Sequence, residues 1–161
     1  MPQNADRIAD SQATKNVNAW LWLIRRCEGT SGPDGYNLLF GGQRFKDLRR
    51  HPNIRVPFTQ SDGTQTWSTA AGAYQILYRT WLSVSSALRL TDFSPSSQDQ
   101  AAIELTRRRG ALDAVKEGDI ERAIDLCAAE WASLPGSRYG QPTRSLAFAL
   151  EAYTDKGGSL A

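Results

Sequence analysis

NVNAWLWLIRRCEG, residues 16–29, carries the clearest structural signal in the chain. Apolar side chains recur in this stretch at intervals of three and four residues, which is the spacing of one buried face of an α-helix. These positions are Val17, Trp20, Leu21, Ile24 and Cys27. Gly29 follows as a residue that commonly ends a helix. The stretch therefore predicts an amphipathic helix that finishes on a carboxylate, Glu28.

Glu28 occupies an unusual place for an acidic residue. It follows Ile24 by four positions and Leu21 by seven, so its side chain shares their inward face. The negative end of the helix dipole and partial desolvation both disfavour ionisation there, and we expect a raised pKa. A carboxyl group that stays protonated near neutral pH is what a general acid requires. The simpler alternative is that Glu28 ends the helix and turns into water.

Length and composition limit the kinds of protein this chain can be. Its 161 residues suffice for one domain with its own core. Residues 1–15 are polar and lack periodicity, so we predict a flexible N-terminal arm followed by a single domain over residues 16–161. Two cysteines and one histidine are too few for a disulfide scaffold, a zinc ribbon or a His-rich metal site, and we expect no metal and no cofactor.

Charge and hydropathy indicate where the chain acts. A net charge of +2 is mildly basic and does not predict nucleic-acid binding. No apolar stretch is long enough to cross a membrane, and the run Ala19–Ile24 is too short for the core of a signal peptide. We therefore expect synthesis in the cytoplasm without stable membrane insertion, unless another factor lets the protein out.

The middle of the chain changes from a helical to a β-prone pattern. Tyr36–Phe40 and Ile54–Phe58 are predicted as short strands, although Pro57 weakens the second. Asp62-Gly63 is a turn signal. Residues 35–67 are therefore expected to form a small irregular β-lobe. Since helical patterns dominate elsewhere, the predicted fold class is α+β, mostly helical.

Four helices are expected after this lobe. They run from just after Gly72 to Thr91-Asp92, from Ser94-Pro95 to Gly110, from a cap at Asp119 to Trp131, and from about Thr143 to Lys156. In the second of them, Ser96 and Asp99 are predicted to form a capping box. Trp20, Trp81 and Trp131 have the spacing of core residues, so we assign them to packing.

The segment Ser68–Gln75 is a candidate ligand site. Small residues surround Tyr74 and Gln75, so the backbone can approach a ligand while two polar side chains contact it. A polar polymer such as a glycan suits this arrangement, and tight packing is the alternative. Aromatic residues in or beside loops are platforms for sugars. The sequence offers Tyr36, Trp67, Tyr74 and Tyr139.

The sequence leaves two other functions to consider, catalysis by a thiol nucleophile and phosphate binding. A thiol nucleophile, Cys27 or Cys127 beside His51, would make a peptidase or amidase, but both cysteines lie on apolar helix faces where a buried free thiol is the simpler interpretation. The run Arg107–Arg109 could bind phosphates. It falls in the last turn of a predicted helix, where cations complement the helix dipole, and we interpret it as a solvated face.

A series of short motifs, in order from Trp20 to Gln141, resembles the bacteriophage lambda endolysin family. The motifs are Cys27-Glu28-Gly29-Thr30, Gly35-Tyr36, Phe40-Gly41-Gly42, Phe45, His51-Pro52, Ser68-Thr69, Gly72, Tyr74-Gln75, Asp92-Phe93-Ser94-Pro95, Ser97-Gln98-Asp99, Arg109-Gly110-Ala111-Leu112, Trp131-Ala132-Ser133-Leu134-Pro135-Gly136 and Tyr139-Gly140-Gln141. Each motif is weak alone, and the ordered set is specific.

The resemblance implies a lysozyme-like domain that degrades bacterial peptidoglycan as a lytic transglycosylase. Such an enzyme cuts between N-acetylmuramic acid and N-acetylglucosamine and leaves 1,6-anhydromuramic acid ends, with Glu28 as the catalytic acid. It further implies a monomer that accumulates in the host cytoplasm and reaches the cell wall in the periplasm after a holin permeabilises the membrane. Motif position and loop placement together give these substrate-binding candidates: Tyr36, Asn37, Ser68, Thr69, Tyr74, Gln75 and Tyr139.

The sequence also bears on the choice between two mechanisms. Hydrolysis of a glycosidic bond requires two carboxylates. Nine residues after Glu28, where related phage lysozymes place an Asp, this chain has Asn37, which cannot act as nucleophile or base. Asp34 is interpreted as a turn residue. A hydrolytic muramidase that uses Asp34 or another carboxylate stays open as an alternative, as does a non-catalytic glycan-binding phage protein.

Overall fold

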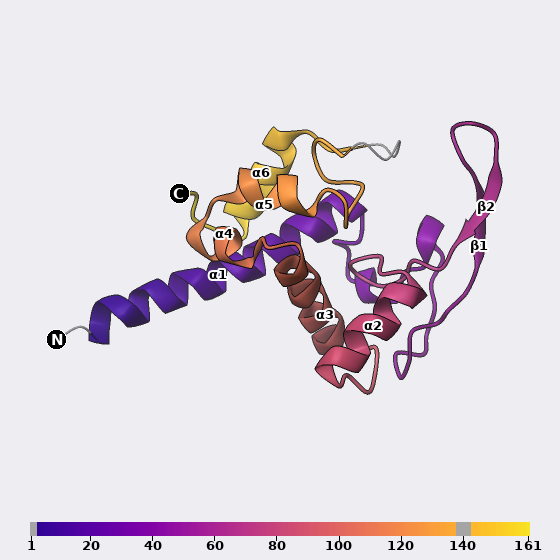
Figure 1. The fold of residues 1–161 in the computed structure, drawn as a ribbon, viewed down its shortest axis with the longest axis horizontal. Helices are drawn as coiled ribbons and strands as arrows, with labels where there is room; N and C mark the ends of the chain where they lie inside the picture. Colours follow the sequence, from indigo (N-terminus) through magenta and orange to yellow (C-terminus); the bar gives the residue numbers. More distant parts are fainter. Residues whose placement is uncertain (1–2, 138–142) are drawn as a thin grey trace. The chain divides into compact units, whose positions relative to one another are not determined.

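The computed structural model describes residues 3–137 and 143–161. Its elements are, in chain order, α1 (Gln3–Glu28), the 3₁₀ turns η1 (Gly35–Asn37) and η2 (Phe40–Gly42), β1 (Val56–Thr59), β2 (Gln65–Ser68), α2 (Tyr78–Leu88), α3 (Pro95–Arg108), α4 (Leu112–Glu117), α5 (Ile120–Cys127) and α6 (Leu146–Asp155) (Figure 1). Within the described ranges these are six α-helices and one two-stranded sheet. The predicted α+β fold class is confirmed.

The chain forms two compact units. One consists of Met1–Cys27 and Leu105–Ala161, and the other of Glu28–Glu104. Helices α1 and α3 each contribute to both units, because the boundaries fall at the last residue of α1 and near the end of α3. Glu28 and the substrate-binding candidates up to Gln75 all belong to the second unit.

Helix α1 begins earlier than the sequence pattern predicts, at Gln3 rather than near Asn16. Side chains bond along its first half: Gln12 Nε2 donates to Asn16 Oδ1 at 2.8 Å, and Thr14 Oγ1 donates to the Asp10 carbonyl at 3.0 Å. Residues 5–11 are nevertheless exposed, so apolar periodicity could not reveal this part of the helix. The proposed flexibility of residues 1–15 stays a prediction.

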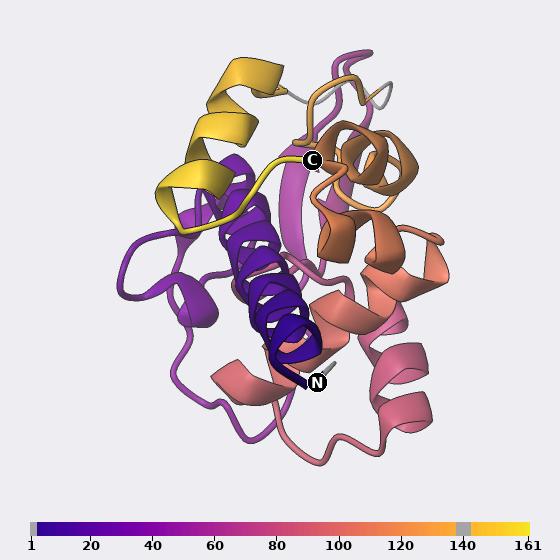
Figure 2. The same ribbon diagram turned by 90° about the vertical axis from the view of Figure 1, so that its left-hand side faces the viewer.

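Within the first unit, α1 is flanked by α6 and by α4 (Figure 2). Lys156 Nζ lies 4.5 Å from the centre of the Trp22 ring, which joins the end of α6 to α1. On the α4 side, Asn16 Nδ2 donates to the Lys116 carbonyl at 2.9 Å. Trp22 is half-buried, as its position off the apolar face predicts.

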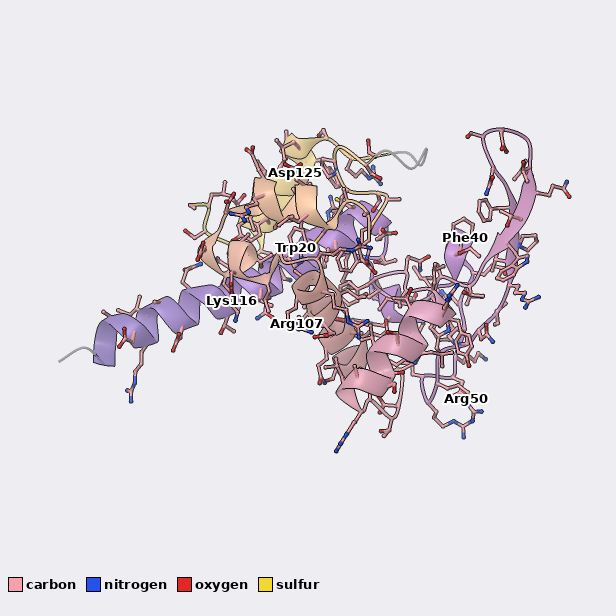
Figure 3. All side chains as sticks on the ribbon, in the orientation of Figure 1. Trp20, Phe40, Arg50, Arg107, Lys116 and Asp125 are labelled. Atoms are coloured by element: carbon pink, nitrogen blue, oxygen red, sulfur yellow. The ribbon has the colours of Figure 1, made fainter. Side chains whose placement is uncertain are left out.

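The predicted core tryptophans are buried. Trp20 is fully enclosed, and its indole N–H donates to Thr106 Oγ1 at 3.0 Å in the first unit (Figure 3). Trp81 and Trp131 are 6% and 3% exposed. Assigning these three rings to packing is therefore confirmed.

The β-lobe of the second unit is a single hairpin. Strands β1 and β2 pair antiparallel, with Val56 opposite Ser68 and Thr59 opposite Gln65, and the turn around Asp62-Gly63 joins them (Figure 1). The prediction of a strand over Tyr36–Phe40 is wrong: this segment forms η1 and η2 with isolated bridges only. The Asn37 N–H donates to the Asp34 carbonyl at 2.8 Å and the Gly42 N–H to the Leu39 carbonyl at 3.0 Å, and these local turn bonds leave no continuous strand ladder. Phe40 instead packs against the hairpin, 4.9 Å from the Phe58 ring (Figure 3).

The helix expected directly after Gly72 starts later, at Tyr78. Residues 72–75 form a tight turn closed by the bridge between Ala71 and Ile76. Gln75 has φ +46°, which is incompatible with continuing a right-handed helix. Consequently Leu77, which precedes the helix, is 47% exposed.

Helix α3 starts at Pro95 as predicted, but its cap differs. Ser94 Oγ accepts from the Ser97 backbone N–H at 3.3 Å, and Asp92 Oδ1 accepts from Ser97 Oγ at 2.6 Å. The predicted capping box of Ser96 with Asp99 is therefore wrong, because Asp99 faces other partners. The cap at Asp119 is confirmed, while α4 was not predicted.

Among the residues that the structure describes, no helix is both long and apolar enough to span a membrane.

Candidate active site

Glu28 is the last residue of α1 and is half-buried. Gly29 follows with φ +76°, the left-handed conformation that ends the helix and releases the chain in a new direction. Next, the buried Thr30 donates its hydroxyl to the Ala73 carbonyl. The backbone directly after Glu28 is therefore fastened to the turn of residues 72–75.

The turn of residues 72–75 is built around Gly72. Its φ is +82°, and an added Cβ would lie 2.2 Å from Gln98 Oε1, so only glycine fits. The same Gln98 oxygen accepts from the Ala73 N–H at 2.9 Å. Gln75 Nε2 donates to the carbonyls of Gly72 and Leu38 at 2.9 and 3.2 Å. These contacts fix the position of the Tyr74 side chain between them.

Asp99 binds both candidate tyrosines, Tyr36 and Tyr74, through their hydroxyl groups. The Tyr36 hydroxyl donates to Asp99 Oδ1 at 2.8 Å, and the Tyr74 hydroxyl donates to the same oxygen at 2.6 Å. The two rings meet edge to face with centroids 6.4 Å apart. Burial and the adjacent Asp99 carboxylate raise the pKa of Tyr74 far above its ordinary value, so its phenol stays protonated and remains a donor.

Gln98, the neighbour of Asp99, holds the same two segments through the backbone. It is fully buried, and its Nε2 donates to the carbonyls of Tyr36 at 3.1 Å and Phe93 at 2.8 Å. Gln98 and Asp99 together connect α3 to η1 and to the turn of residues 72–75. The sequence pattern points to neither residue as part of the site, because partners 25 and 62 to 63 positions away leave no local signal.

Several predicted substrate-binding side chains instead hold the backbone. Asn37 Nδ2 donates to the Phe45 carbonyl at 3.0 Å. Ser68 Oγ accepts from the Ala70 N–H at 3.1 Å, and Thr69 Oγ1 accepts from the Tyr78 N–H at 3.0 Å. Gln75 likewise bonds to backbone carbonyls. None of these hydrogen bonds directs the four side chains toward a common point.

Burial separates residues that a ligand can reach from residues that support them. Tyr74 and Thr69 are 2% and 8% exposed, so they act as supports. Tyr36, Asn37, Ser68 and Gln75 are half-buried. Tyr139 lies outside the described residues. Trp67, an aromatic candidate, is 50% exposed on β2, and the Arg55 guanidinium lies 4.3 Å from its ring centre.

His51 is a structural residue of the second unit. Its Nε2 lies 2.8 Å from the Ile76 carbonyl, and its Nδ1 accepts from the Asn53 N–H at 3.0 Å, which fixes the neutral tautomer with the proton on Nε2. Burial lowers the pKa of His51. Both ring nitrogens are engaged, so neither is left to activate a thiol.

The cysteines fit the same conclusion. Cys27 and Cys127 are both buried free thiols. Burial first, and then the nearby Glu130 carboxylate, raise the pKa of Cys127 to about 12, so it carries almost no thiolate at neutral pH. These observations oppose the cysteine peptidase or amidase alternative.

Two of the remaining charged candidates, Asp34 and Arg109, form ion pairs. Asp34 Oδ2 lies 2.7 Å from Arg44 Nη2 on the surface, and Glu130 Oε2 lies 2.7 Å from Arg109 Nη2. Arg109 is thus engaged by a carboxylate rather than presented to a phosphate. In the described ranges, no three His, Cys, Asp or Glu side chains come together as a metal site.

The second unit therefore combines one carboxylate at a helix end with a fixed tyrosine pair. In its protonated form such a carboxyl group can donate a proton to a leaving group, and the half-buried polar side chains of the same unit can bind hydroxyl and amide groups. Aromatic rings, acceptor oxygens and a carboxyl group at a helix end are a combination that suits a glycan.

Comparisons with known proteins agree in both sequence and fold. Residues 18–160 match the family model described as endolysin. The chain is 40% identical over 148 residues to the endolysin of Escherichia phage lambda, covering 88% of this chain and 91% of the relative. It is 39% identical over 155 residues to the endolysin of Escherichia phage P2, covering 89% and 94%.

Solved structures give the same result. Bacteriophage lambda lysozyme in complex with a chitohexasaccharide superimposes with a TM-score of 0.83 and 35% identity, covering 91% of this chain and 97% of that chain. A second structure of lysozyme from bacteriophage lambda gives a TM-score of 0.77 at the same identity and coverage. The fold is therefore shared with these proteins.

Proposed function

This chain belongs to the endolysin family, a lysozyme-like class of phage enzymes that lyse peptidoglycan, and we propose that it does so as a lytic transglycosylase with Glu28 as its catalytic acid. The bond cut is the β-1,4 linkage between N-acetylmuramic acid and N-acetylglucosamine. The substrate is the glycan strand of peptidoglycan, and the complex of lambda lysozyme with a chitohexasaccharide supports a glycan ligand.

One observation carries the choice of mechanism. The residue nine positions after Glu28 has an amide side chain, and that amide is already engaged in a hydrogen bond within the fold. Asn37 Nδ2 donates to the Phe45 carbonyl, so the side chain is neither a nucleophile nor a base. Asp34, the other nearby candidate, is paired with Arg44 on the surface. A mechanism that needs only one carboxyl group therefore fits these residues better than ordinary hydrolysis.

The proposed first step is acid catalysis by Glu28. Its carboxyl group gives its proton to the glycosidic oxygen while the bond from that oxygen to C1 of the muramic acid breaks. Positive charge develops at C1 and the ring oxygen. The Glu28 carboxylate formed in this step stabilises that charge.

In the second step the substrate supplies its own nucleophile. The C6 hydroxyl of the same muramic acid attacks C1, and its proton passes to the Glu28 carboxylate, which restores the acid. The reaction is favoured because the hydroxyl is already held within the same sugar. No water is consumed, so the product has a 1,6-anhydro end instead of a reducing end.

We further propose a monomer that is made in the host cytoplasm and reaches the cell wall when a separate membrane protein, a holin, permeabilises the inner membrane. This part rests on the resemblance to phage endolysins. The lipid bilayer itself is not a proposed ligand, and neither is nucleic acid.

Glu28→Gln tests the assigned acid. The amide has the shape of the carboxyl group but no transferable proton, so clearing of purified sacculi should fall by at least about a thousandfold while the thermal midpoint and sacculus binding persist. Glu151→Gln, the same change at an exposed site on α6, is the control and should clear sacculi normally. Normal clearing by Glu28→Gln would refute the assignment.

A further inference from the structure

The Asp99 carboxylate takes no step in the chemistry proposed for Glu28, yet it organises the tyrosine pair. Both hydroxyls donate to one oxygen, Oδ1, at 2.8 Å from Tyr36 and 2.6 Å from Tyr74. Bonds of this length between a hydroxyl and a carboxylate are charge-assisted and stronger than neutral ones. A phenol has a single proton, so both protons are committed to Asp99.

This commitment decides what Tyr36 can offer a ligand. With its proton directed at Asp99, the Tyr36 hydroxyl has no proton to give a ligand, so it can meet a ligand only as an acceptor. The group that it binds must then be a donor. A glycan of N-acetylated sugars carries two kinds of donor, hydroxyl groups and acetamido N–H groups.

The arrangement is held rigidly by the surrounding fold. Tyr74 is 2% exposed and sits in the turn that Gln98 fastens through the Ala73 N–H. Gln98 also binds the Tyr36 carbonyl, so consecutive residues of α3 fix the backbone and the hydroxyl of the same tyrosine. Tyr36 itself is half-buried and keeps part of its ring exposed. Binding then requires little reordering of these groups.

We propose that Asp99 is a positioning residue for glycan recognition: it directs the hydroxyl protons of Tyr36 and Tyr74 onto itself, so that Tyr36 accepts a hydrogen bond from a hydroxyl or acetamido N–H of the glycan. The inference rests on the proposed glycan substrate. It assigns Asp99 a role in binding and orientation, and none in breaking the bond.

The test measures glycan binding without turnover. In the Glu28→Gln background, the Kd for chitohexaose is determined for Tyr36→Phe, Asp99→Asn and the double variant. Removing the acceptor or the charge that orients it should weaken binding about tenfold in each single variant. Because both changes break one interaction, the double variant should be no more than about twofold weaker than either single variant.

Asp92→Asn is the matched control. Asp92 precedes the same helix and accepts from Ser94 and Ser97, so this variant loses the same charge beside α3 without touching the tyrosines. It should bind chitohexaose as tightly as the background variant. A loss equal to that of Asp99→Asn would show a general effect of charge or stability and would overturn the proposal.

Kinetics with Glu28 intact separate positioning from catalysis. Asp99→Asn should raise KM about tenfold and change kcat less than about threefold. A fall in kcat of more than about a hundredfold at unchanged KM would make Asp99 a participant in the chemistry and contradict the proposal. If the double variant instead weakened chitohexaose binding by the product of the two single-variant factors, the two residues would act independently, and this would also contradict the proposal.

A further measurement uses the wild-type protein, so it does not depend on whether a variant folds. The two phenol protons should appear as slowly exchanging downfield NMR resonances, and both should persist when chitohexaose binds. Loss of the Tyr36 resonance on binding would mean that it donates to the glycan, against the proposal. These experiments measure glycan binding, so their results do not depend on whether the reaction product has a 1,6-anhydro end or a reducing end. A failure of the transglycosylase mechanism would be detected separately, from the end group of the product.

Discussion

The side chain of Asn37 has a structural task that its sequence position conceals. Position 37 attracts attention because it lies nine residues after Glu28, where the resemblance to phage lysozymes predicts an acid. In this chain Nδ2 donates to the Phe45 carbonyl while the Asn37 carbonyl accepts from the Phe45 N–H at 2.9 Å. Asn37 therefore joins two loop segments through both its backbone and its side chain. Its amide therefore serves the fold first.

Asn37→Asp should affect stability more than catalysis. Aspartate cannot donate to the Phe45 carbonyl and brings two negative oxygens together, so the free energy of unfolding should fall by about 1–3 kcal/mol. Sacculus clearing at a temperature where the variant is folded should change less than about threefold, because in the proposed mechanism Glu28 alone supplies the proton. Chemical denaturation and turbidity assays measure the two quantities.

Asn53→Asp provides the comparison for this substitution. Asn53 is exposed with φ +48°, a conformation that Asp also tolerates, and the same chemical change there should leave stability nearly unaltered. If Asn37→Asp instead removes most of the activity while remaining as stable as the wild type, Asn37 has a direct role in the reaction.

At the scale of elements, the turn of residues 72–75 is the part on which the site depends. Gly72 lets the Gln98 side chain approach its backbone, and Gln98 in turn fixes Ala73 and Tyr36. The turn is also the anchor for Thr30, two residues after Glu28. Disturbing it should therefore alter stability and glycan binding together.

Gly72→Ala should lower the free energy of unfolding by about 3 kcal/mol or more. Part of this loss is the left-handed backbone, about 1–2 kcal/mol for alanine, and the rest is the overlap with Gln98 and the Phe93 ring. Gly63→Ala is the matched control, since Gly63 has φ +85° but nothing within 4 Å of an added Cβ. Equal losses in both variants, measured by denaturation, would show that the contact with Gln98 does not matter.

Sequence periodicity predicted the elements that have one buried face. The end of α1 at Glu28 and Gly29, the cap of α5 at Asp119 and the end of α6 before Gly157-Gly158 all follow from apolar spacing and capping residues. In each case the signal lies within a few residues of the feature that it marks. The position of the acid followed from this local pattern.

Elements set by distant contacts could not be predicted in this way. Tyr36–Phe40 has β-prone residues, but the isolated bridge from Leu39 to Ala71 and the packing of Phe40 against Phe58 of the hairpin decide its structure. The bonds from Asp99 to Tyr36 and Tyr74 span 63 and 25 residues, and nothing local to Asp99 distinguishes them from a helix cap. The supporting half of the site therefore required the structure.

For the molecule as a whole, His51 is a source of pH-dependent stability near neutrality. The chain has a single histidine, His51, and burial among Tyr78, Trp81 and Phe93 lowers its pKa below the ordinary value of 6.5. Below pH 6.5 the unfolded chain takes up a proton there that the folded chain does not. Stability is therefore complete above pH 6.5 and decreases as the pH falls toward the lowered pKa.

The free energy of unfolding should consequently fall between pH 7 and 5.5, with a slope of at most about 1.4 kcal/mol per pH unit from His51. His51→Gln, which keeps a donor and an acceptor, should flatten this part of the profile whatever its absolute stability. Denaturant titrations at several pH values measure both slopes. Parallel profiles for the two proteins would mean that His51 is not the group responsible.

The most direct test of the transglycosylase assignment is the mass of the soluble fragments released from purified peptidoglycan by the intact protein. Attack by the C6 hydroxyl predicts muropeptides that are one water lighter than hydrolysis products and have no reducing end, so that Glu28 alone suffices. Fragments of full mass with reducing ends would show that water is the nucleophile, and would contradict the single-carboxylate mechanism.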